Sequence, residues 1–264
     1  MEVWNQFDEI VCICLASRND RYIEQKEIFD KAGIPVSFYR PKKHKNGGVQ
    51  GCFESHISVI TDSYNKGLNN VLIFEDDATP SSEFNIKNMM ECISFMKTNS
   101  DWDLLFLGSN VKSGYKTEDT TSPNIFKSRF LNAHAYVVSR KGMEKYANLN
   151  YISQIDVVYT TNHHSYAFLP SMFNQRLSKS DIGDNETYMG LKNPTTHRAF
   201  QILNNYYARY IGYNGKCILE LLMVCSVLFM YYKPVYRGRL LVIFLILMAL
   251  YKGANWIGYL QDNH

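Results

Sequence analysis

Short apolar runs alternate with segments of helical spacing along the first half of the chain. The first run, Ile10 to Leu15, is continuous and rich in β-branched residues, which predicts a buried strand. Similar runs predict further strands at 35–39, 71–74, 103–107 and 133–138. Helical spacing predicts helices at 22–32, about 53–66, about 85–97 and from about 141, with Gly33 and Gly67 as stops. Polar, glycine-bearing stretches at 41–48 and 111–123 predict surface loops.

This alternation predicts an α/β fold in which a mostly parallel sheet carries helices on both faces. In such folds, ligands bind beyond the carboxyl ends of the strands. Two polar segments follow predicted strands directly: the segment from Arg18 to Arg21 and the acidic triplet Glu75-Asp76-Asp77. We therefore expect both segments to lie at the ligand-binding edge of the sheet.

The pattern changes after Gly215, which predicts a body over 1–215 and a hydrophobic tail over 216–264. Residues 217–232 are apolar apart from Glu220 and Ser226, and residues 240–251 contain no polar side chain except the terminal tyrosine. We expect a helical hairpin that associates with a membrane through 217–260, by spanning or lying in the interface. A helical pair packed on the body is the soluble alternative. The N-terminus shows no signal peptide, so the body is expected to be cytoplasmic.

The net charge of +3 lies entirely in the tail, because the body carries equal numbers of acidic and basic residues. A neutral body lacks the positive field that nucleic-acid binding requires, so we expect no nucleic-acid partner. The six cysteines form no CxxC pair, which is typical of buried thiols in a reducing compartment.

Three adjacent carboxylates at the end of a buried strand repel each other. A divalent cation removes this repulsion, and oxygen ligands suit Mg²⁺ or Mn²⁺, which also bind nucleotide phosphates. Taken alone, the triplet at 75–77 is also consistent with a solvated acidic turn before Pro80. Its neighbours along the chain favour the metal site.

Six segments, in order, resemble glycosyltransferase family 25, which includes lipooligosaccharide and procollagen galactosyltransferases. They are IVCICLASRNDR near the start, GCFESH (51–56) with VLIFEDDA (71–78), DWDLLFLGS (101–109), HAYVVSRKG (134–142), Ile155-Asp156 with Leu169-Pro170, and SDIG (180–183). The resemblance covers roughly residues 10 to 183. The first segment departs from the usual Asn-Leu-Asp form, with Cys-Leu-Ala at 14–16. The tail lies outside the resemblance.

The resemblance implies a GT-A-like, Rossmann-type fold, a UDP-sugar donor, Mn²⁺ (or Mg²⁺) and transfer with inversion. Asp76 and Asp77 would correspond to the metal-binding carboxylates, with Asp77 as the direct ligand and Glu75 as its support. It also assigns Ser55 and His56, in the first turn of their helix, to the donor site. For His56, a structural hydrogen bond is the alternative.

Two arginines follow the first strand, where a diphosphate would lie. The guanidinium groups of Arg18 and Arg21 suit phosphate, although an exposed loop and helix start explains them equally well. His134 is open to a structural or a binding role, and adjacent His163 and His164 are interpreted as surface residues.

Inverting transfer requires a base that removes the proton of the acceptor hydroxyl. Asp156 and Asp181 are the candidates, and each also fits a structural role such as a helix cap. Asp156 lies among apolar residues that would raise its pKa, so we assign the base to Asp156 and acceptor or donor contacts to Asp181.

These observations predict a hexosyltransferase that moves galactose or glucose from a UDP-sugar to a glycan or hydroxylated protein acceptor. A metal-dependent nucleotide-sugar hydrolase would use the same site. A catalytically silent, membrane-anchored carbohydrate-binding or scaffold protein would retain the fold without the activity.

Overall fold

The computed structural model describes residues 3–112, 115 and 117–176, and all elements named here lie within these ranges. A 3-10 turn, η1 (Trp4–Gln6), precedes the first strand. The helices are α1 (Asn19–Ala32), α2 (Gly48–Asn65), α3 (Ile86–Thr98), α4 (Arg140–Tyr146) and α5 (Ile155–Tyr159). The strands are β1 (Glu9–Ile13), β2 (Ser37–Tyr39), β3 (Asn70–Glu75), β4 (Ala78–Pro80), β5 (Leu104–Val111), β6 (Glu118–Asp119), β7 (Ile125–Lys127), β8 (Phe130–Ser139), β9 (Ser165–Phe168) and β10 (Phe173–Gln175).

One mixed sheet forms the centre of the described part, with its strands in the order β2-β1-β3-β8-β5-β9-β7-β6. Strands β2, β1 and β3 are parallel neighbours, as are β5 and β9. Strand β8 runs antiparallel to both β3 and β5, between which it lies. Most strands share one direction, as predicted, and β7 and β8 oppose them. The alternating pattern predicted a strand at 133–138, but its direction depends on long-range pairing that the pattern does not encode.

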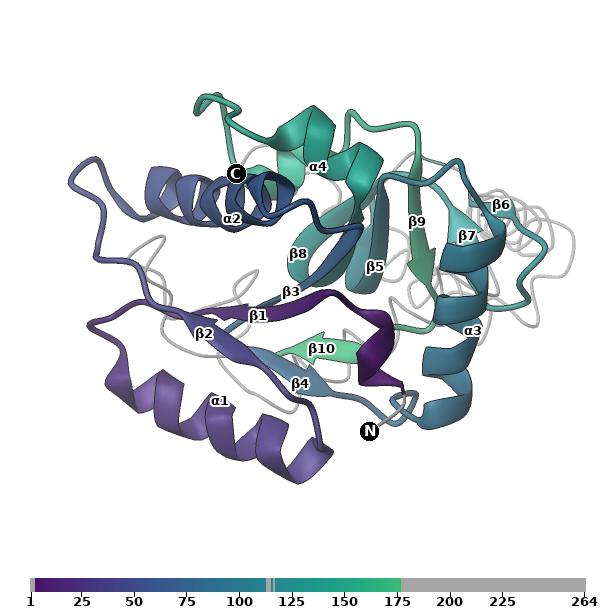
Figure 1. Cartoon of the computed structure of the whole chain (residues 1–264), viewed down its shortest axis with the longest axis horizontal. Helices are drawn as coiled ribbons and strands as arrows, with labels where there is room; N and C mark the ends of the chain where they lie inside the picture. Colours follow the sequence, from purple (N-terminus) through teal and green to yellow (C-terminus); the bar gives the residue numbers. More distant parts are fainter. Residues whose placement is uncertain (1–2, 113–114, 116, 177–264) are drawn as a thin grey trace, which may run out of the picture.

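Helices cover both faces of the sheet, as the alternation predicted (Figure 1). On one face, α2, α4 and α5 pack on a core that includes Phe53, Ile60 and Tyr136. On the other face, α1 and α3 pack on a second core that includes Phe29 and Phe95. Each of these five side chains is at most 1% exposed, and burial of such a side chain stabilises the fold by about 1.5–3 kcal/mol.

The helix ends follow from local chemistry. Gly33 ends α1 in the left-handed conformation, with φ of 67°, which a glycine adopts without steric cost. The Asn85 side chain caps α3 by accepting a hydrogen bond from the Asn88 amide at 2.9 Å. The Ser139 hydroxyl caps α4 by accepting from the Gly142 amide at 3.0 Å. These caps fix where the helices begin relative to the strands that carry the site.

A second, two-stranded antiparallel sheet joins β4, directly after the acidic triplet, to β10, about a hundred residues further on. We call this pair the β4–β10 ribbon; the sequence pattern did not predict it. Two hydrogen bonds anchor its base: Ser81 donates its amide to Met172 at 2.8 Å and its hydroxyl to the Ser171 carbonyl at 2.7 Å. The ribbon therefore holds residues 173–176 next to residues 76–78.

The described residues include no helix that is long and apolar enough to cross a membrane. The predicted tail (216–264) and its boundary with the body lie outside the described residues. The stretch predicted as a surface loop at 111–123 contains the two-residue strand β6.

Candidate active site

The carboxyl ends of β1 and β3 lie side by side, because the two strands pair in parallel with Ile13 opposite Glu75. This register brings the segment after β1 next to the acidic triplet. The N-terminal end of the antiparallel strand β8 reaches the same edge, where Ala135 pairs with Phe74. The edge of the sheet at which sequence analysis placed the ligand site therefore contains the carboxyl ends of β1 and β3 and the amino end of β8.

Glu75 is held by a histidine from α2. His56 Nε2 lies 3.1 Å from Glu75 Oε1, and the His56 ring is 1% exposed. Its Nδ1 lies 2.7 Å from the Tyr136 hydroxyl, which lies 2.9 Å from the Tyr159 hydroxyl. Burial would raise the pKa of Glu75, but the hydrogen bond from His56 and the nearby positive charges together outweigh burial, so the pKa lies below its ordinary value. Glu75 is thus an ionised carboxylate oriented by a buried chain of side chains.

Asp76 is paired with an arginine from α1. Arg21 Nη1 lies 2.5 Å from Asp76 Oδ1, and Arg21 and Asp76 are only 8% exposed. Burial raises the pKa of Asp76, although the charge of Arg21 opposes the rise. The structure therefore brings Arg21 to the triplet, as a counter-charge to Asp76. Arg18 lies nearby but pairs with the exposed Asp20 at 2.9 Å.

Asp77 is the triplet residue with an unsatisfied oxygen. Its Oδ2 accepts a hydrogen bond from Gln175 Nε2 at 3.1 Å, whereas its buried Oδ1 has no hydrogen-bond partner. Burial raises the pKa of Asp77 to about 8, and the charges of Glu75 and Asp76 add to the rise. A buried carboxylate oxygen without a donor, beside two other carboxylates, is the environment that a hard divalent cation stabilises.

Two residues at the end of the β4–β10 ribbon, Gln175 and Arg176, contact the triplet, and sequence analysis missed both. Besides the bond from Gln175, Arg176 donates its amide to the Asp77 carbonyl at 2.7 Å and its Nη2 to the Asp76 carbonyl at 3.2 Å. Arg176 also forms an ion pair with Glu24 on α1. Neither residue belongs to a motif, and only the Leu169-Pro170 match a few residues earlier indicated that this segment approaches the site.

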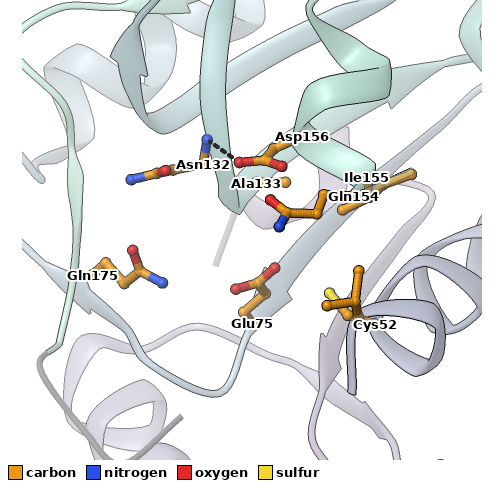
Figure 2. Close-up of a pocket in the computed structure, with 9 residues that line it drawn as sticks. Cys52, Glu75, Asn132, Ala133, Gln154, Ile155, Asp156 and Gln175 are labelled. Carbon is orange, nitrogen blue, oxygen red and sulfur yellow. Dashed lines mark hydrogen bonds between the residues drawn. The ribbon is translucent and has the colours of Figure 1, made fainter. Parts of the chain in front are cut away.

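A cavity of about 120 Å³ opens beside Glu75. Its lining comes from α2, β3, β8, α5 and β10: Val49, Cys52, Glu75, Asn132, Ala133, Gln154, Ile155, Asp156 and Gln175. Figure 2 shows the Glu75 carboxylate directed into the space between Gln175, Gln154 and Cys52. The cavity is smaller than the roughly 300–1,000 Å³ of typical ligand sites, so it has room for only part of a ligand of that size.

Asp156 lies on the opposite side of this cavity from Glu75 (Figure 2). Its Oδ2 accepts a hydrogen bond from the Asn132 amide at 3.3 Å, and its Oδ1 accepts from the Val157 amide at 2.8 Å. Burial raises the pKa of Asp156, and these two amides partly oppose the rise. Asn132 has a left-handed backbone, with φ of 66°, which asparagine tolerates better than most residues. The structure thus brings Asp156 into the cavity that Glu75 lines.

The remaining predicted residues have local partners. Ser55, 6% exposed, donates its hydroxyl to the Gly51 carbonyl at 2.6 Å. His134 is buried, with Nε2 at 3.0 Å from the Phe173 carbonyl. His163 is exposed beside Arg129, as the surface interpretation expected, whereas His164 is half-buried and pairs with Asp101. Asp181 lies outside the described residues.

Comparison with known proteins finds one family model that matches the chain. Residues 37–161 match the model of glycosyltransferase family 25, described as LPS biosynthesis protein. The matched segment, a little under half of the chain, is similar to this family.

Two curated human proteins resemble parts of the chain. Procollagen galactosyltransferase 2 is 27% identical over 134 residues, which are 48% of this chain and 20% of that protein. Inactive glycosyltransferase 25 family member 3 is 40% identical over 63 residues, which are 23% of this chain and 10% of that protein. The chain therefore matches a tenth to a fifth of the length of these relatives.

Two solved structures show weaker likeness. A197 from STIV has a TM-score of 0.41 and 14% identity, and the match covers 62% of this chain and 81% of that one. A glycosyltransferase involved in the glycosylation of the major capsid of PBCV-1 has a TM-score of 0.34 and 10% identity, over 52% of this chain and 62% of that one.

Proposed function

We propose that this protein is a metal-dependent hexosyltransferase with a GT-A-like fold. It transfers galactose or glucose from a UDP-sugar to a hydroxyl of a glycan or hydroxylated protein, with inversion at the anomeric carbon. The observation that carries the proposal is the unsatisfied Oδ1 of Asp77 at the end of β3, beside two other carboxylates, in a chain that is similar to family 25.

Asp77 and Asp76 would hold the cation, Mn²⁺ or Mg²⁺. When bound, the cation neutralises the charge that develops on the diphosphate leaving group. The positive charge of Arg21 reduces the repulsion between Asp76 and the neighbouring carboxylates. It therefore stabilises the buried triplet in the metal-free protein. Gln175 and Arg176 hold Asp77 from the β4–β10 ribbon.

Asp156 is the proposed base. It lines the cavity beside Glu75, and burial raises its pKa, which makes its carboxylate a stronger base than an exposed aspartate. The carboxylate removes the proton of the acceptor hydroxyl as its oxygen attacks the anomeric carbon and the bond to the diphosphate breaks. Asp181 is proposed to contact acceptor or donor, and Arg18 and the segment after β1 to lie beside the nucleotide.

A catalytically silent protein is the second candidate, because one relative of the matched segment carries the name of an inactive family member. An active transferase turns over a UDP-sugar, whereas a silent protein does not. The full chain, purified in detergent, is incubated with UDP-galactose or UDP-glucose and Mn²⁺, with and without hydroxylated acceptors, and UDP release is measured.

A transferase releases UDP faster with acceptor, and Asp77→Asn lowers kcat/KM by about 100-fold or more because a charge-stabilising contact is lost. Glu118→Gln, an exposed acid on the far edge strand β6, is the matched control and retains activity. Acceptor-independent release would identify a hydrolase. Absence of turnover with every donor and acceptor would favour the silent protein, and turnover that is indifferent to Asp77→Asn would contradict the role proposed for Asp77.

We also propose that residues 217–260 attach the protein to a membrane, with the body on the cytoplasmic side. The support is the apolar sequence of that segment together with its basic residues at 233–239, which suit anionic head groups.

A further inference from the structure

Cys52, His56 and Glu75 converge on one point at the rim of the cavity. Each contributes one potential ligand atom, and the three atoms lie within 4.8 Å of one another. Cys52 and His56 are four residues apart on α2, so they share one face of that helix. Glu75 approaches them from the end of β3. A hydrogen-bonded His–Glu pair explains two of these side chains, but not the thiol beside them.

The set has the donor chemistry of a zinc site. A thiolate sulfur, an imidazole nitrogen and a carboxylate oxygen are all zinc ligands, and three protein ligands leave a fourth position open. A tetrahedral zinc ion holds its nitrogen and oxygen ligands about 3.4 Å apart and its sulfur about 3.6 Å from each. His56 Nε2 and Glu75 Oε1 already lie 3.1 Å apart. The Cys52 sulfur lies within 4.8 Å of a ligand atom of each of these two residues.

The second ring nitrogen of His56, Nδ1, has the kind of hydrogen-bond partner that is usual for metal-binding histidines. Zinc-bound histidines hydrogen-bond through the ring nitrogen that does not bind the metal, which fixes the ring orientation. Here Nδ1 lies 2.7 Å from the Tyr136 hydroxyl, which is backed by Tyr159 at 2.9 Å. Hydroxyl groups donate or accept. The tyrosine pair can therefore stay in place when Nε2 gives up its proton to bind a cation.

We infer that Cys52, His56 and Glu75 form a site for a thiophilic divalent cation such as Zn²⁺, separate from the oxygen site proposed at Asp76 and Asp77. Sulfur and nitrogen donors favour Zn²⁺ over Mn²⁺, whereas an all-oxygen set suits Mn²⁺ and Mg²⁺. Cys52 and Glu75 also line the cavity to which Gln154 and Asp156 contribute. The inference does not depend on sugar transfer.

Cobalt substitution tests this site directly. The full chain in detergent is stripped of metal with a chelator and titrated with Co²⁺. Wild type is expected to show a near-ultraviolet thiolate-to-Co²⁺ charge-transfer band that saturates at one equivalent and that Zn²⁺ abolishes. Cys52→Ser removes the band. Tyr136→Phe keeps it but weakens Co²⁺ binding about 10–100-fold, because the partner of His56 is lost.

Control variants separate this site from its neighbours. Cys14→Ser changes the buried thiol near Asp76, and Cys92→Ser changes a buried thiol on α3, on the other face of the sheet. Both should keep the band, as should Asp77→Asn, which instead loses Mn²⁺ binding. Circular dichroism verifies folding, and Glu75→Gln, which keeps the side-chain shape, is the second test if Cys52→Ser fails to fold. The inference is overturned if wild type shows no band, or if the band survives Cys52→Ser or disappears with Cys14→Ser.

Discussion

At the scale of single residues, the acidic triplet is three carboxylates in three different environments. Glu75 forms a hydrogen bond with His56, and Asp76 forms an ion pair with Arg21. Asp77 has one oxygen that accepts no hydrogen bond. Their positions in the chain are adjacent, yet only Asp77 has a pKa raised to about 8. Asp77 is therefore the residue of the triplet whose charge depends most on a bound cation.

Cation binding at Asp77 should depend steeply on pH. Below pH 8 the carboxyl is protonated, so a cation must displace the proton, and the apparent Mn²⁺ affinity should rise about ten-fold per pH unit up to about pH 8. Calorimetry in two buffers of different ionisation enthalpy should report release of about one proton near pH 7. Asp77→Asn should abolish both effects. Binding that is independent of pH between 6 and 8 would contradict this assignment.

The same shift makes a stability prediction of defined sign. The folded pKa of Asp77 exceeds its unfolded value, near 3.8, so the folded state binds more protons between pH 4 and 8. Without metal, this residue therefore lowers the free energy of unfolding as pH rises through that window. Asp77→Asn should stabilise the metal-free protein at pH 8 by about 1–3 kcal/mol, because it removes a buried, poorly satisfied charge. Denaturant titration at pH 5 and pH 8 measures the difference.

Asp156 should affect chemistry and not metal binding. In an active transferase, Asp156→Asn is expected to lower kcat by about 10²–10⁴-fold with little change in the KM for the UDP-sugar, because it removes the base. Asparagine keeps one of the two oxygens that accept from the Asn132 and Val157 amides, so circular dichroism should verify that the fold survives. Unchanged Mn²⁺ affinity is the control. Loss of Mn²⁺ binding in this variant would place Asp156 in the cation site instead.

At the scale of elements, the β4–β10 ribbon depends on a glycine in the central sheet. A side chain on Gly108 would meet His134 Nε2 and would lie 2.6 Å from the Phe173 carbonyl, the two groups that hydrogen-bond to each other. Gly108 therefore allows β8 and β10 to approach β5 closely.

Gly108→Ala should destabilise the protein by about 1–3 kcal/mol, because it overpacks this contact. It should also weaken Mn²⁺ binding, since Gln175 and Arg176 reach the triplet from β10. Thermal unfolding and Mn²⁺ titration measure the two effects. In a double-mutant cycle, His134→Ala should relieve part of the cost. Full additivity of the two substitutions would mean that the crowding lies elsewhere.

The elements that could be predicted from sequence are those whose pattern is local. Strands β1, β3, β5 and β8 contain runs of residues that become buried on both faces, and the helices begin and end at caps and glycines. Strands β4 and β10 are three residues long and have no apolar run, so only their pairing defines them. The same holds for the site: the triplet and Asp156 were found from the sequence, whereas Gln175 and Arg176 reach it through tertiary contacts.

At the scale of the whole molecule, the proposed membrane attachment depends on the apolar run at 240–251. The double substitution Leu245→Arg and Leu247→Arg should abolish flotation of the protein with vesicles that contain anionic lipid. Each arginine adds a charge that costs about 2.5–3.5 kcal/mol in a bilayer core. The matched control replaces Ile86 and Met90 on α3, exposed at 73% and 49%, and should leave flotation unchanged. Flotation that survives the tail substitutions would overturn the proposal.

Strand β8 has a further consequence for how the chain is made. Its residues 130–139 fill the gap between β3 and β5, whose sequences end before it begins. During synthesis, the edges of β3 and β5 that pair with β8 therefore have no partner until residue 139 has left the ribosome. Unpaired strand edges of this kind promote aggregation. The contacts that close the sheet are also long-range, which slows folding. A chain interrupted between residues 111 and 130 would be a strong substrate for chaperones, and the carboxylate site would assemble only at the end of folding.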